Sequence, residues 1–190
     1  MRPRIYTTIA LILFCALSLS AQVKYSIKSH KVEVVGTSNL HDWTATIAKL
    51  TGSSEFKVDG SSLILTSAVV DIDANSFSGS KGSIMDGKIK DTFDSEKYPK
   101  IRFSMTKVNS SQTVGNVTTL NISGILGVKN SNRPVDFTVK AVALGSGDIE
   151  VRSSKRMKMS EIGLKAPTAM LGTLKTADDV TVNIYFLLKK

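Results

Sequence analysis

The sequence is poor in several residues on which metal sites and covalent scaffolds depend. Its 190 residues include one cysteine, two histidines and four prolines. A single cysteine cannot form an internal disulfide and cannot build a cysteine-based zinc site. Two histidines leave little scope for a histidine-rich metal centre, and four prolines do not supply a proline-rich linker. The scarcity therefore excludes a disulfide framework and disfavours a metal centre.

The overall composition is that of a folded, basic chain. Hydrophobic residues make up 42% and charged residues 22%, which argues against a disordered or collagen-like chain. The length fits one domain. Lys and Arg number 25 against 16 Asp and Glu, for a formal net charge of +9. That excess is compatible with nucleic acid, with anionic lipid or with simple solubility, and composition does not choose among them.

Residues 1–21 have the pattern of a secretory signal peptide. The start is positively charged, Ile9–Leu19 is almost wholly apolar, and the small residues Ser20 and Ala21 follow. The apolar run is shorter than the roughly 20 residues that a membrane-spanning helix needs. We therefore expect export to the periplasm or out of the cell, with cleavage after Ser20 or Ala21.

Export would change the composition of the mature chain. Cys15 lies inside the apolar run, and the bulky Phe14 precedes it where lipoprotein signals carry a small residue, so we expect no lipid anchor. Cleavage after Ala21 would leave about 169 residues with no cysteine. The loss of Arg2 and Arg4, with no acid removed, would lower the formal charge from +9 to +7.

Most of the chain after residue 21 alternates apolar and polar residues with a period of two, which is typical of strands with one buried face. In Ser62–Asp73 we expect Leu63, Leu65 and Val69 to share a face, and the strand to be well covered because both faces are apolar. The expected strands are Tyr25–Lys28, Lys31–Gly36, Asp42–Leu50, Ser54–Val58, Ser62–Asp73, Lys100–Val108, Val117–Val128, Pro134–Leu144, Ile149–Met159 and Val180–Leu188.

Turn signals indicate how these strands connect. Val58–Ser61 and Gly145–Asp148 each predict a β-hairpin. Short strands with tight turns favour antiparallel pairing in a sandwich or a barrel, and no strand–helix–strand spacing favours a parallel sheet. The fold class that we expect is all-β with one short helix.

The helix is expected within Ser80–Phe93. Ile84 or Met85, then Ile89 and Phe93, recur at helical spacing, and Ser83 with Asp86 three residues later would cap its start. A helix inserted between two halves of an antiparallel sheet could lie across the mouth of a barrel.

Few residues offer a catalytic hypothesis. His41-Asp42-Trp43 invites one, but neighbouring residues on a strand point to opposite faces, and there is no Gly-x-Ser-x-Gly elbow. The alternative is a turn that feeds a strand, with Trp43 entering the core. We favour that alternative and expect no catalytic residue.

Metal and phosphate motifs are equally weak. Asp71 and Asp73 share a strand face but lack the further oxygen ligands that calcium requires, and Gly79–Gly82 has the wrong spacing for a phosphate-binding loop. We expect no metal and no cofactor. The basic run Lys155–Lys158 favours a solvated strand face over anionic lipid head groups, and its flanking methionines disfavour nucleic acid.

What remains is apolar volume. An eight-stranded barrel can be filled by its side chains or can enclose one small ligand, and the period alone does not distinguish these cases. The residues expected at or near inward positions are Trp43, Phe56, Phe77, Met85, Phe93, Phe103, Met105, Phe137, Met157, Met159, Met170 and Phe186.

Three segments in order resemble the YceI-like family. The first is Gly36–Trp43, and the second, Phe93–Phe103, resembles the family's F-D-x-x-x-Y-P-x-I-x-F stretch. The third runs from Gly124 to Val128 and resumes at Arg133-Pro134-Val135, although Gly127–Asn130 departs from the polar turn that is usual there. The resemblance covers essentially the whole chain after the signal.

This resemblance implies a single lipocalin-like antiparallel barrel of about eight strands, exported to the periplasm, that encloses a polyisoprenoid, a quinone-like molecule or a fatty amide or acid. It implies no catalytic residues. Combining it with the alternation, we expect the ligand to contact Trp43, Phe77, Met85, Ile89, Phe93, Phe103, Met105 and Phe137.

Other functions stay open at this point. A solidly packed barrel would suit a non-catalytic envelope stress or interaction module, and His41 would be the residue of a hydrolase or isomerase. Contact with a membrane and a homodimer are also open, although no residue indicates the dimer.

Overall fold

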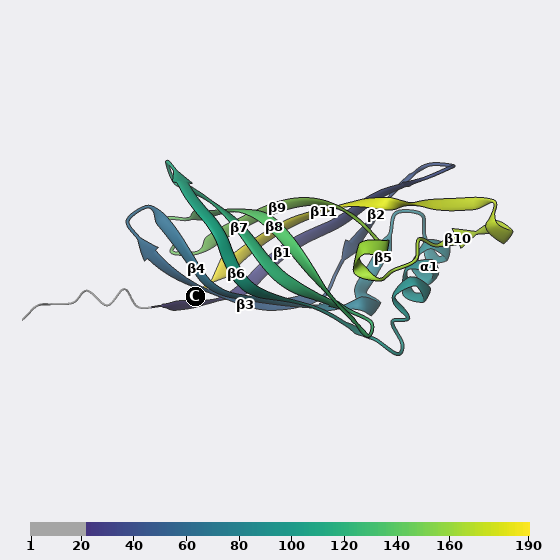
Figure 1. The fold of residues 1–190 in the computed structure, drawn as a ribbon, viewed down its shortest axis with the longest axis horizontal. Coiled ribbons are helices and arrows are strands. Elements are labelled where there is room, and N and C mark those ends of the chain that lie inside the picture. Colours follow the sequence, from purple (N-terminus) through teal and green to yellow (C-terminus); the bar gives the residue numbers. More distant parts are fainter. Residues whose placement is uncertain (1–21) are drawn as a thin grey trace, which may run out of the picture.

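The computed structural model describes residues 22–190, so the expected signal peptide, with Cys15, lies outside the described residues. The strands of this part form one closed antiparallel barrel of eight strands, with one short α-helix (Figure 1). The single domain expected after the signal is in keeping with this barrel. No helix within residues 22–190 is long and apolar enough to cross a membrane.

The elements follow one another along the chain with short connections. They are β1 (Val23–Ser38), β2 (Asp42–Ile47), β3 (Leu50–Asp59), β4 (Ser62–Asp73), η1 (Ala74–Ser76), β5 (Phe77–Gly79), α1 (Ser83–Phe93), β6 (Lys100–Val114), β7 (Val117–Val128), β8 (Ser131–Ala143), β9 (Ile149–Lys158), η2 (Ser160–Ile162), β10 (Thr168–Ala169), η3 (Met170–Gly172) and β11 (Leu174–Lys189).

The barrel closes because β1 pairs on both of its edges. Along one edge it pairs with β11, from Ser26 opposite Lys189 to Ser38 opposite Thr176. Along the other edge its first residues pair with β3 and its last residues pair with β2. The remaining order is β11-β9-β8-β7-β6-β4-β3, and every pairing is antiparallel, as expected. Both predicted hairpins are confirmed.

Three strand predictions need correction, and each correction has a local cause. Tyr25–Lys28 and Lys31–Gly36 belong to one strand, since a β-bulge between Ile27 and Ser29 shifts the alternation without ending the strand. Asp42–Leu50 divides into β2 and β3, because the backbone N–H of Ala48 donates to the carbonyl of Ser76 and turns the chain.

The third correction concerns β4, in which Thr66 is an extra residue that has no partner on β3. Leu63 and Leu65 are buried before it, whereas Ala68, Val70 and Ile72 face inward after it. Val69 therefore does not share the face of Leu63 and Leu65. The strand is also less covered than expected, because Ile64 is 45% exposed.

Helix α1 begins three residues later than Ser80, and its start is not capped as expected. Gly82 is the N-cap residue with a φ of 77°, and no side chain caps the helix. The Asp86 carboxylate instead accepts a hydrogen bond of 2.6 Å from the backbone N–H of Gly79. The carboxylate therefore ties the first turn of α1 to β5.

The end of α1 is fixed to the corner between β4 and β5. Asp94 adopts a left-handed conformation with a φ of 48° and ends the helix. The next residue, Ser95, is buried, and its hydroxyl donates to the side-chain carbonyl of Asn75 at 2.8 Å. The Phe93 ring stacks on Phe77 with centroids 4.9 Å apart. These contacts hold α1 across one end of the barrel (Figure 1).

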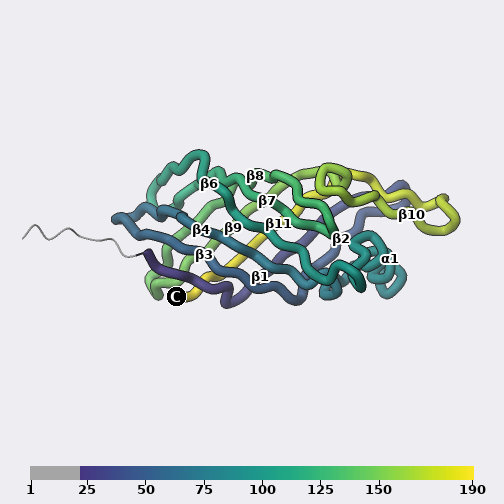
Figure 2. Tube along the Cα trace, turned by 60° about the horizontal axis from the view of Figure 1, so that its bottom comes forward, coloured from purple at the N-terminus to yellow at the C-terminus, as the bar shows by residue number. Residues whose placement is uncertain are grey.

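The two ends of the barrel differ in packing. The end away from α1 is filled by a cluster of buried side chains, in which the Tyr25 ring meets Phe56 edge-on at 5.9 Å. Residue 22 and the C-terminus lie at this end, as the purple and yellow ends of the trace show in Figure 2. The largest buried side chains here are Tyr25, Phe56, Leu63, Leu120, Ile149 and Leu188.

The close approach of β6 and β7 generates a first prediction. A Cβ at Gly124 would lie 2.3 Å from the Phe103 ring and 2.7 Å from the carbonyl oxygen of Ser104. Gly124→Ala should therefore lower the free energy of unfolding by about 1–3 kcal/mol, because Phe103 must move. Urea unfolding measures the loss. Gly145→Ala is the control, since nothing lies within 4 Å of its Cβ, and equal stability of the two variants would contradict the prediction.

Candidate functional site

The barrel is hollow between the filled end and α1. A cavity of about 600 Å³ occupies this space, within the range of roughly 300–1,000 Å³ that is usual for small-molecule sites. It reaches solvent at the α1 end, where exposed residues such as Leu40, Lys81 and Ile84 line its mouth. The barrel is therefore not solidly packed.

The wall of the cavity is built from the inward faces of the strands. Phe103 on β6 meets Phe137 on β8 edge-on, with centroids 5.4 Å apart, and Phe186 reaches the same region from β11. These rings are only half-buried although they lie inside the barrel. Their accessible surface faces the cavity, so an apolar occupant would bury it.

Helix α1 forms one side of the mouth and packs closely against β5, where Gly79 has no side chain. A Cβ on Gly79 would lie 2.5 Å from the Met85 side chain, so the helix can sit at this distance only over a glycine. Met85, Ile89 and Phe93 then turn their apolar side chains to the cavity. The pattern of helical spacing in the sequence correctly indicated this face.

The structure brings together seven of the eight residues that we expected to contact a ligand. Met105 is the exception: it packs against the filled end and does not line the cavity. Met105 lies on the same face of β6 as Phe103 but two residues nearer the filled end, where the buried cluster covers it. The seven that line the cavity are Trp43, Phe77, Met85, Ile89, Phe93, Phe103 and Phe137.

Other lining residues escaped the sequence analysis or changed their role. Met170, expected to point inward, borders the mouth but is 71% exposed. Val32 and Val34 of β1 were missed, although the alternation of Lys31–Gly36 contains them, and Ala68 and Val70 were hidden by the bulge in β4. Leu164 follows η2, where no periodic pattern exists. The alternation of Val180–Leu188 correctly indicated Val182, Ile184 and Phe186.

The titratable side chains on the lining are all of basic residue types. Among the described residues that border the cavity, the titratable ones are His41, Lys81 and Lys88, and none is acidic. Lys88 lies 3.7 Å from the Asp91 carboxylate, which is itself exposed and outside the lining. The mouth is thus suited to a neutral or acidic head group, and the interior to apolar chain.

His41 belongs to a turn that shapes the mouth. The Ser38 hydroxyl donates to the carbonyl of His41 at 2.8 Å and accepts from the N–H of His41 at 3.1 Å. Trp43 lies against Gly36, where a Cβ would come within 2.2 Å of the indole, and its Nε1 donates to the carbonyl of Thr37. These contacts give the residues of Gly36–Trp43 a structural role. The His41 imidazole stays exposed.

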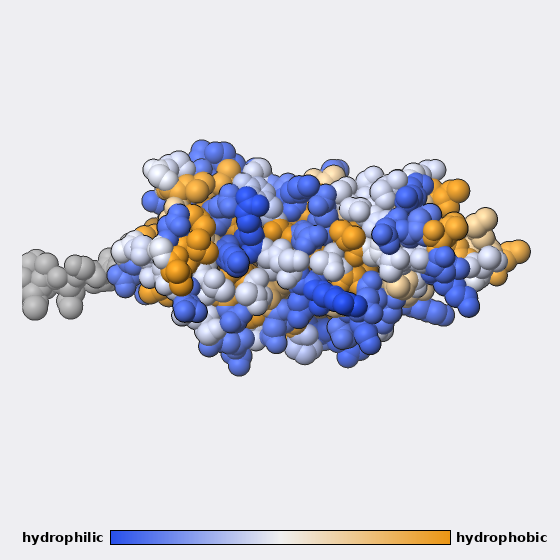
Figure 3. All heavy atoms as spheres, turned by 90° about the horizontal axis from the view of Figure 1, so that it is seen from above, coloured by the Kyte–Doolittle hydropathy of each residue, from blue (hydrophilic) through white to orange (hydrophobic). Residues whose placement is uncertain are grey.

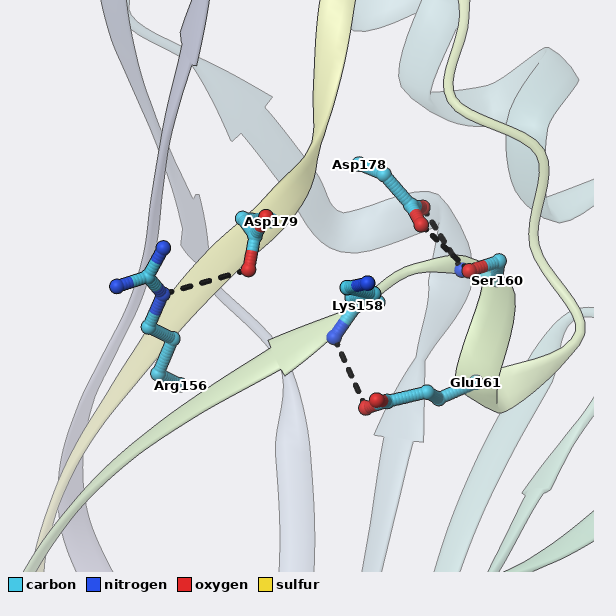
Figure 4. Close-up of polar contacts among 6 residues, drawn as sticks. All are labelled: Arg156, Lys158, Ser160, Glu161, Asp178 and Asp179. Atoms are coloured by element: carbon cyan, nitrogen blue, oxygen red, sulfur yellow. Dashed lines mark hydrogen bonds and ion pairs between the residues drawn. The ribbon is translucent and has the colours of Figure 1, made fainter.

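A polar corner fixes the junction of β9, η2 and β11 (Figure 4). The Asp178 carboxylate accepts from the backbone N–H and the hydroxyl of Ser160, and Glu161 accepts from the N–H of Lys158 at 3.0 Å. These bonds lower the pKa of Asp178, with the Ser160 hydroxyl as the main cause. They fix η2, so that Met159, Ile162 and Leu164 face the cavity.

The remaining charged candidates have structural partners. Asp71 lies 3.6 Å from Arg102 on the neighbouring strand, and Asp73 accepts from the N–H of Asn75 at the start of η1. Within residues 22–190, no group of three or more His, Cys, Asp or Glu could hold a metal ion. In the Lys155–Lys158 run, Arg156 pairs with Asp179 at 3.3 Å (Figure 4).

Comparison with known protein families gives a match over the whole barrel. The model of the YceI-like domain matches residues 22–188. The chain belongs to the YceI-like family. The expected resemblance is thereby confirmed for the whole described barrel, and no curated protein matches the chain.

Solved structures with the same fold come from several organisms. BcnA of Burkholderia cenocepacia is 22% identical with a TM-score of 0.65, covering 85% of this chain and 96% of its own. A polyisoprenoid-binding domain from Saccharophagus degradans, implicated in plant cell wall breakdown, is 17% identical with a TM-score of 0.66, covering 89% and 99%. The YceI protein of Campylobacter jejuni is 18% identical with a TM-score of 0.58, covering 77% and 84%.

These similarities confirm the fold of this YceI-like protein. At such identities they do not transfer a ligand, so the residues of this chain must carry the argument for one. What the family and the cavity support together is a barrel that binds lipid or isoprenoid.

The polar corner predicts a dependence on pH. Because the folded state lowers the pKa of Asp178, the carboxylate stabilises the fold above its ordinary pKa of about 3.9 and stops doing so as the pH falls through the lowered value. Thermal unfolding should show Asp178→Asn less stable than the parent at pH 7. The gap should close below about pH 4.

The control for this experiment is Asp59→Asn, which changes an exposed carboxylate at the β3–β4 hairpin. Its stability should follow that of the parent at both pH values. A gap between the parent and Asp178→Asn that stays constant down to pH 2–3 would contradict the assignment.

Proposed function

We propose that this YceI-like protein is an exported carrier that encloses one long apolar molecule, such as a polyisoprenoid, a quinone-like molecule or a fatty amide or acid. The observation that carries the proposal is the cavity of about 600 Å³ with its almost wholly apolar wall. The signal-like pattern of residues 1–21 supports export to the periplasm or outside. Storage, transport and protection under stress would each use the same site.

Burial alone can hold such a ligand. Each CH₂ group removed from water contributes roughly 0.8 kcal/mol, so about ten of them supply near 8 kcal/mol before the costs of ordering. Half-buried rings such as Phe103, Phe137 and Phe186 gain cover at the same time. Neither a metal nor a cofactor is needed for this mode of binding.

Native mass spectrometry of protein purified from its own host tests the proposal directly. A carrier should retain a lipid of defined mass in the gas phase, and the mass should return to that of the chain after solvent extraction. A chain that is always empty, and that takes up no long-chain lipid when one is offered, would contradict the proposal.

The wall of the cavity generates a mutational prediction. Phe103→Gln places an amide in the apolar wall, and an unpaired buried amide costs about 1–3 kcal/mol, so lipid affinity should fall about ten- to hundred-fold. Fluorescence titration with a long-chain probe measures the affinity. Met105→Gln is the matched control on the same strand, because Met105 lies outside the lining. Equal affinities in two folded variants would remove Phe103 from the site.

The catalytic alternative has its own test at His41. Because the imidazole is exposed at the mouth and the turn depends on the backbone of His41, His41→Ala should leave stability and lipid affinity within about two-fold of the parent. Titration and thermal unfolding check this. Chemical conversion of the retained lipid by the parent, absent in the variant, would instead favour an enzyme.

A further inference from the structure

Large apolar side chains protrude from the open end of the barrel. Leu40 is 67% exposed, Ile84 77%, Met170 71% and Leu171 fully exposed, and we call these four residues the mouth rim. They come from the β1–β2 turn, from α1 and from η3, which lie at the same end in Figure 1. Figure 3 shows hydrophobic residues gathered at the tip of this end.

The backbone holds part of the mouth rim in an unfavourable conformation. Met170 and Leu171 both have a positive φ, of 50° and 53°. The left-handed region costs a residue with a side chain roughly 1–2 kcal/mol. Burial within this chain does not offset this conformational cost, since both side chains are exposed to solvent. Strain that serves no packing inside the protein indicates a role outside it.

One asparagine joins two parts of the mouth rim. The Asn39 side chain donates to the carbonyl of Thr173 and accepts from the N–H of Lys175, both at 2.9 Å. Its backbone N–H donates to the carbonyl of Lys175 at 3.1 Å. The turn that carries Leu40 and the loop that carries Leu171 are therefore fixed side by side.

The mouth rim is continuous with the cavity. Leu40, Ile84 and Met170 border the cavity and are also exposed to solvent. A long apolar ligand that enters or leaves through this mouth must pass over them. In water that passage would expose the ligand, whereas against an apolar phase it would not.

The three segments that carry the mouth rim are mainly basic. The segments 38–43, 79–93 and 165–175 contain five lysines and three acids. Asp86 accepts a bond from Gly79, and Lys88 and Asp91 pair with each other, which leaves four lysines and Asp42. Lys81, Lys165 and Lys175 are exposed. Apolar side chains flanked by lysines match the surface of a membrane that contains anionic lipid.

We propose that the mouth rim docks on a lipid bilayer containing anionic lipid, so that the ligand passes between membrane and cavity without crossing water. Leu171 and its neighbours enter the interface, and the lysines meet the head groups. This inference rests on the proposed lipid carriage for its purpose, whereas docking itself depends only on the rim.

Sedimentation with sucrose-loaded vesicles tests the docking. The probes are vesicles of phosphatidylcholine with about one third phosphatidylglycerol, and vesicles of phosphatidylcholine alone. The double variant Met170→Ser/Leu171→Ser should bind the anionic vesicles at least about ten-fold more weakly, since two apolar side chains no longer enter the interface. Val114→Ser is the matched control: Val114 is 70% exposed, near the β6–β7 hairpin at the other end.

A charge variant separates the two contributions. Lys81→Glu/Lys175→Glu should lose binding to the anionic vesicles and leave the weaker binding to neutral vesicles unchanged, whereas Lys107→Glu on β6 should alter neither. Circular dichroism and thermal unfolding check that the variants fold. We expect them to fold because every replaced side chain is exposed, and only Met170 and Lys81 border the cavity.

Each outcome decides the inference. It is overturned if the parent does not sediment with either vesicle, if Val114→Ser weakens binding as much as the rim variant, or if the rim instead joins two copies of the chain, seen by ultracentrifugation as a dimer that the rim variant abolishes. Titration with a long-chain probe without vesicles separates the proposals. Tight probe binding without sedimentation overturns docking alone, and sedimentation without probe binding overturns carriage alone.

Discussion

Closure of the backbone ladder is the constraint on which the rest of this molecule depends. A hollow interior gives up the contacts that a packed core would supply, so stability must come from elsewhere. Here β1 pairs along both edges, so that every strand of the barrel has a neighbour on each side. The cluster around Tyr25 and Phe56 fills the far end. These two features leave the side of the barrel near α1 free to stay open.

Short polar motifs then shape the mouth. Ser38 and Asn39 fix one turn, Asn75 and Ser95 fix the end of α1, and Asp178 fixes η2. Each motif satisfies backbone groups where strand pairing ends, which keeps polar atoms out of the apolar wall. Two glycines serve the same end, since Gly36 receives the Trp43 ring and Gly79 receives Met85. Two of the segments that resemble the family, Gly36–Trp43 and Phe93–Phe103, contain some of these supports.

Periodicity in the sequence predicted the strands and the helix, but it did not predict the β-bulges, each of which depends on a single extra residue. Alternation indicated the strands, and helical spacing placed Met85, Ile89 and Phe93 at the mouth. The bulges at Thr66 and after Met105 were not predicted, because an extra residue in one strand is defined only against its partner. The mouth rim was also missed, since exposure of Leu171 follows from a left-handed backbone at η3 rather than from any pattern.

An apolar wall attracts any chain that fits, because the hydrophobic effect has no direction. Selectivity would then arise from the length and width of the cavity and from the mouth, where Lys81 and Lys88 lie. The wall residues can be exchanged among large apolar types with little loss, provided that volume is kept. This accounts for a fold that is shared at 17–22% identity over most of the chain. For the proposed carrier, discrimination among ligands would therefore rest on the cavity dimensions and on a few mouth residues, and affinity on the apolar wall.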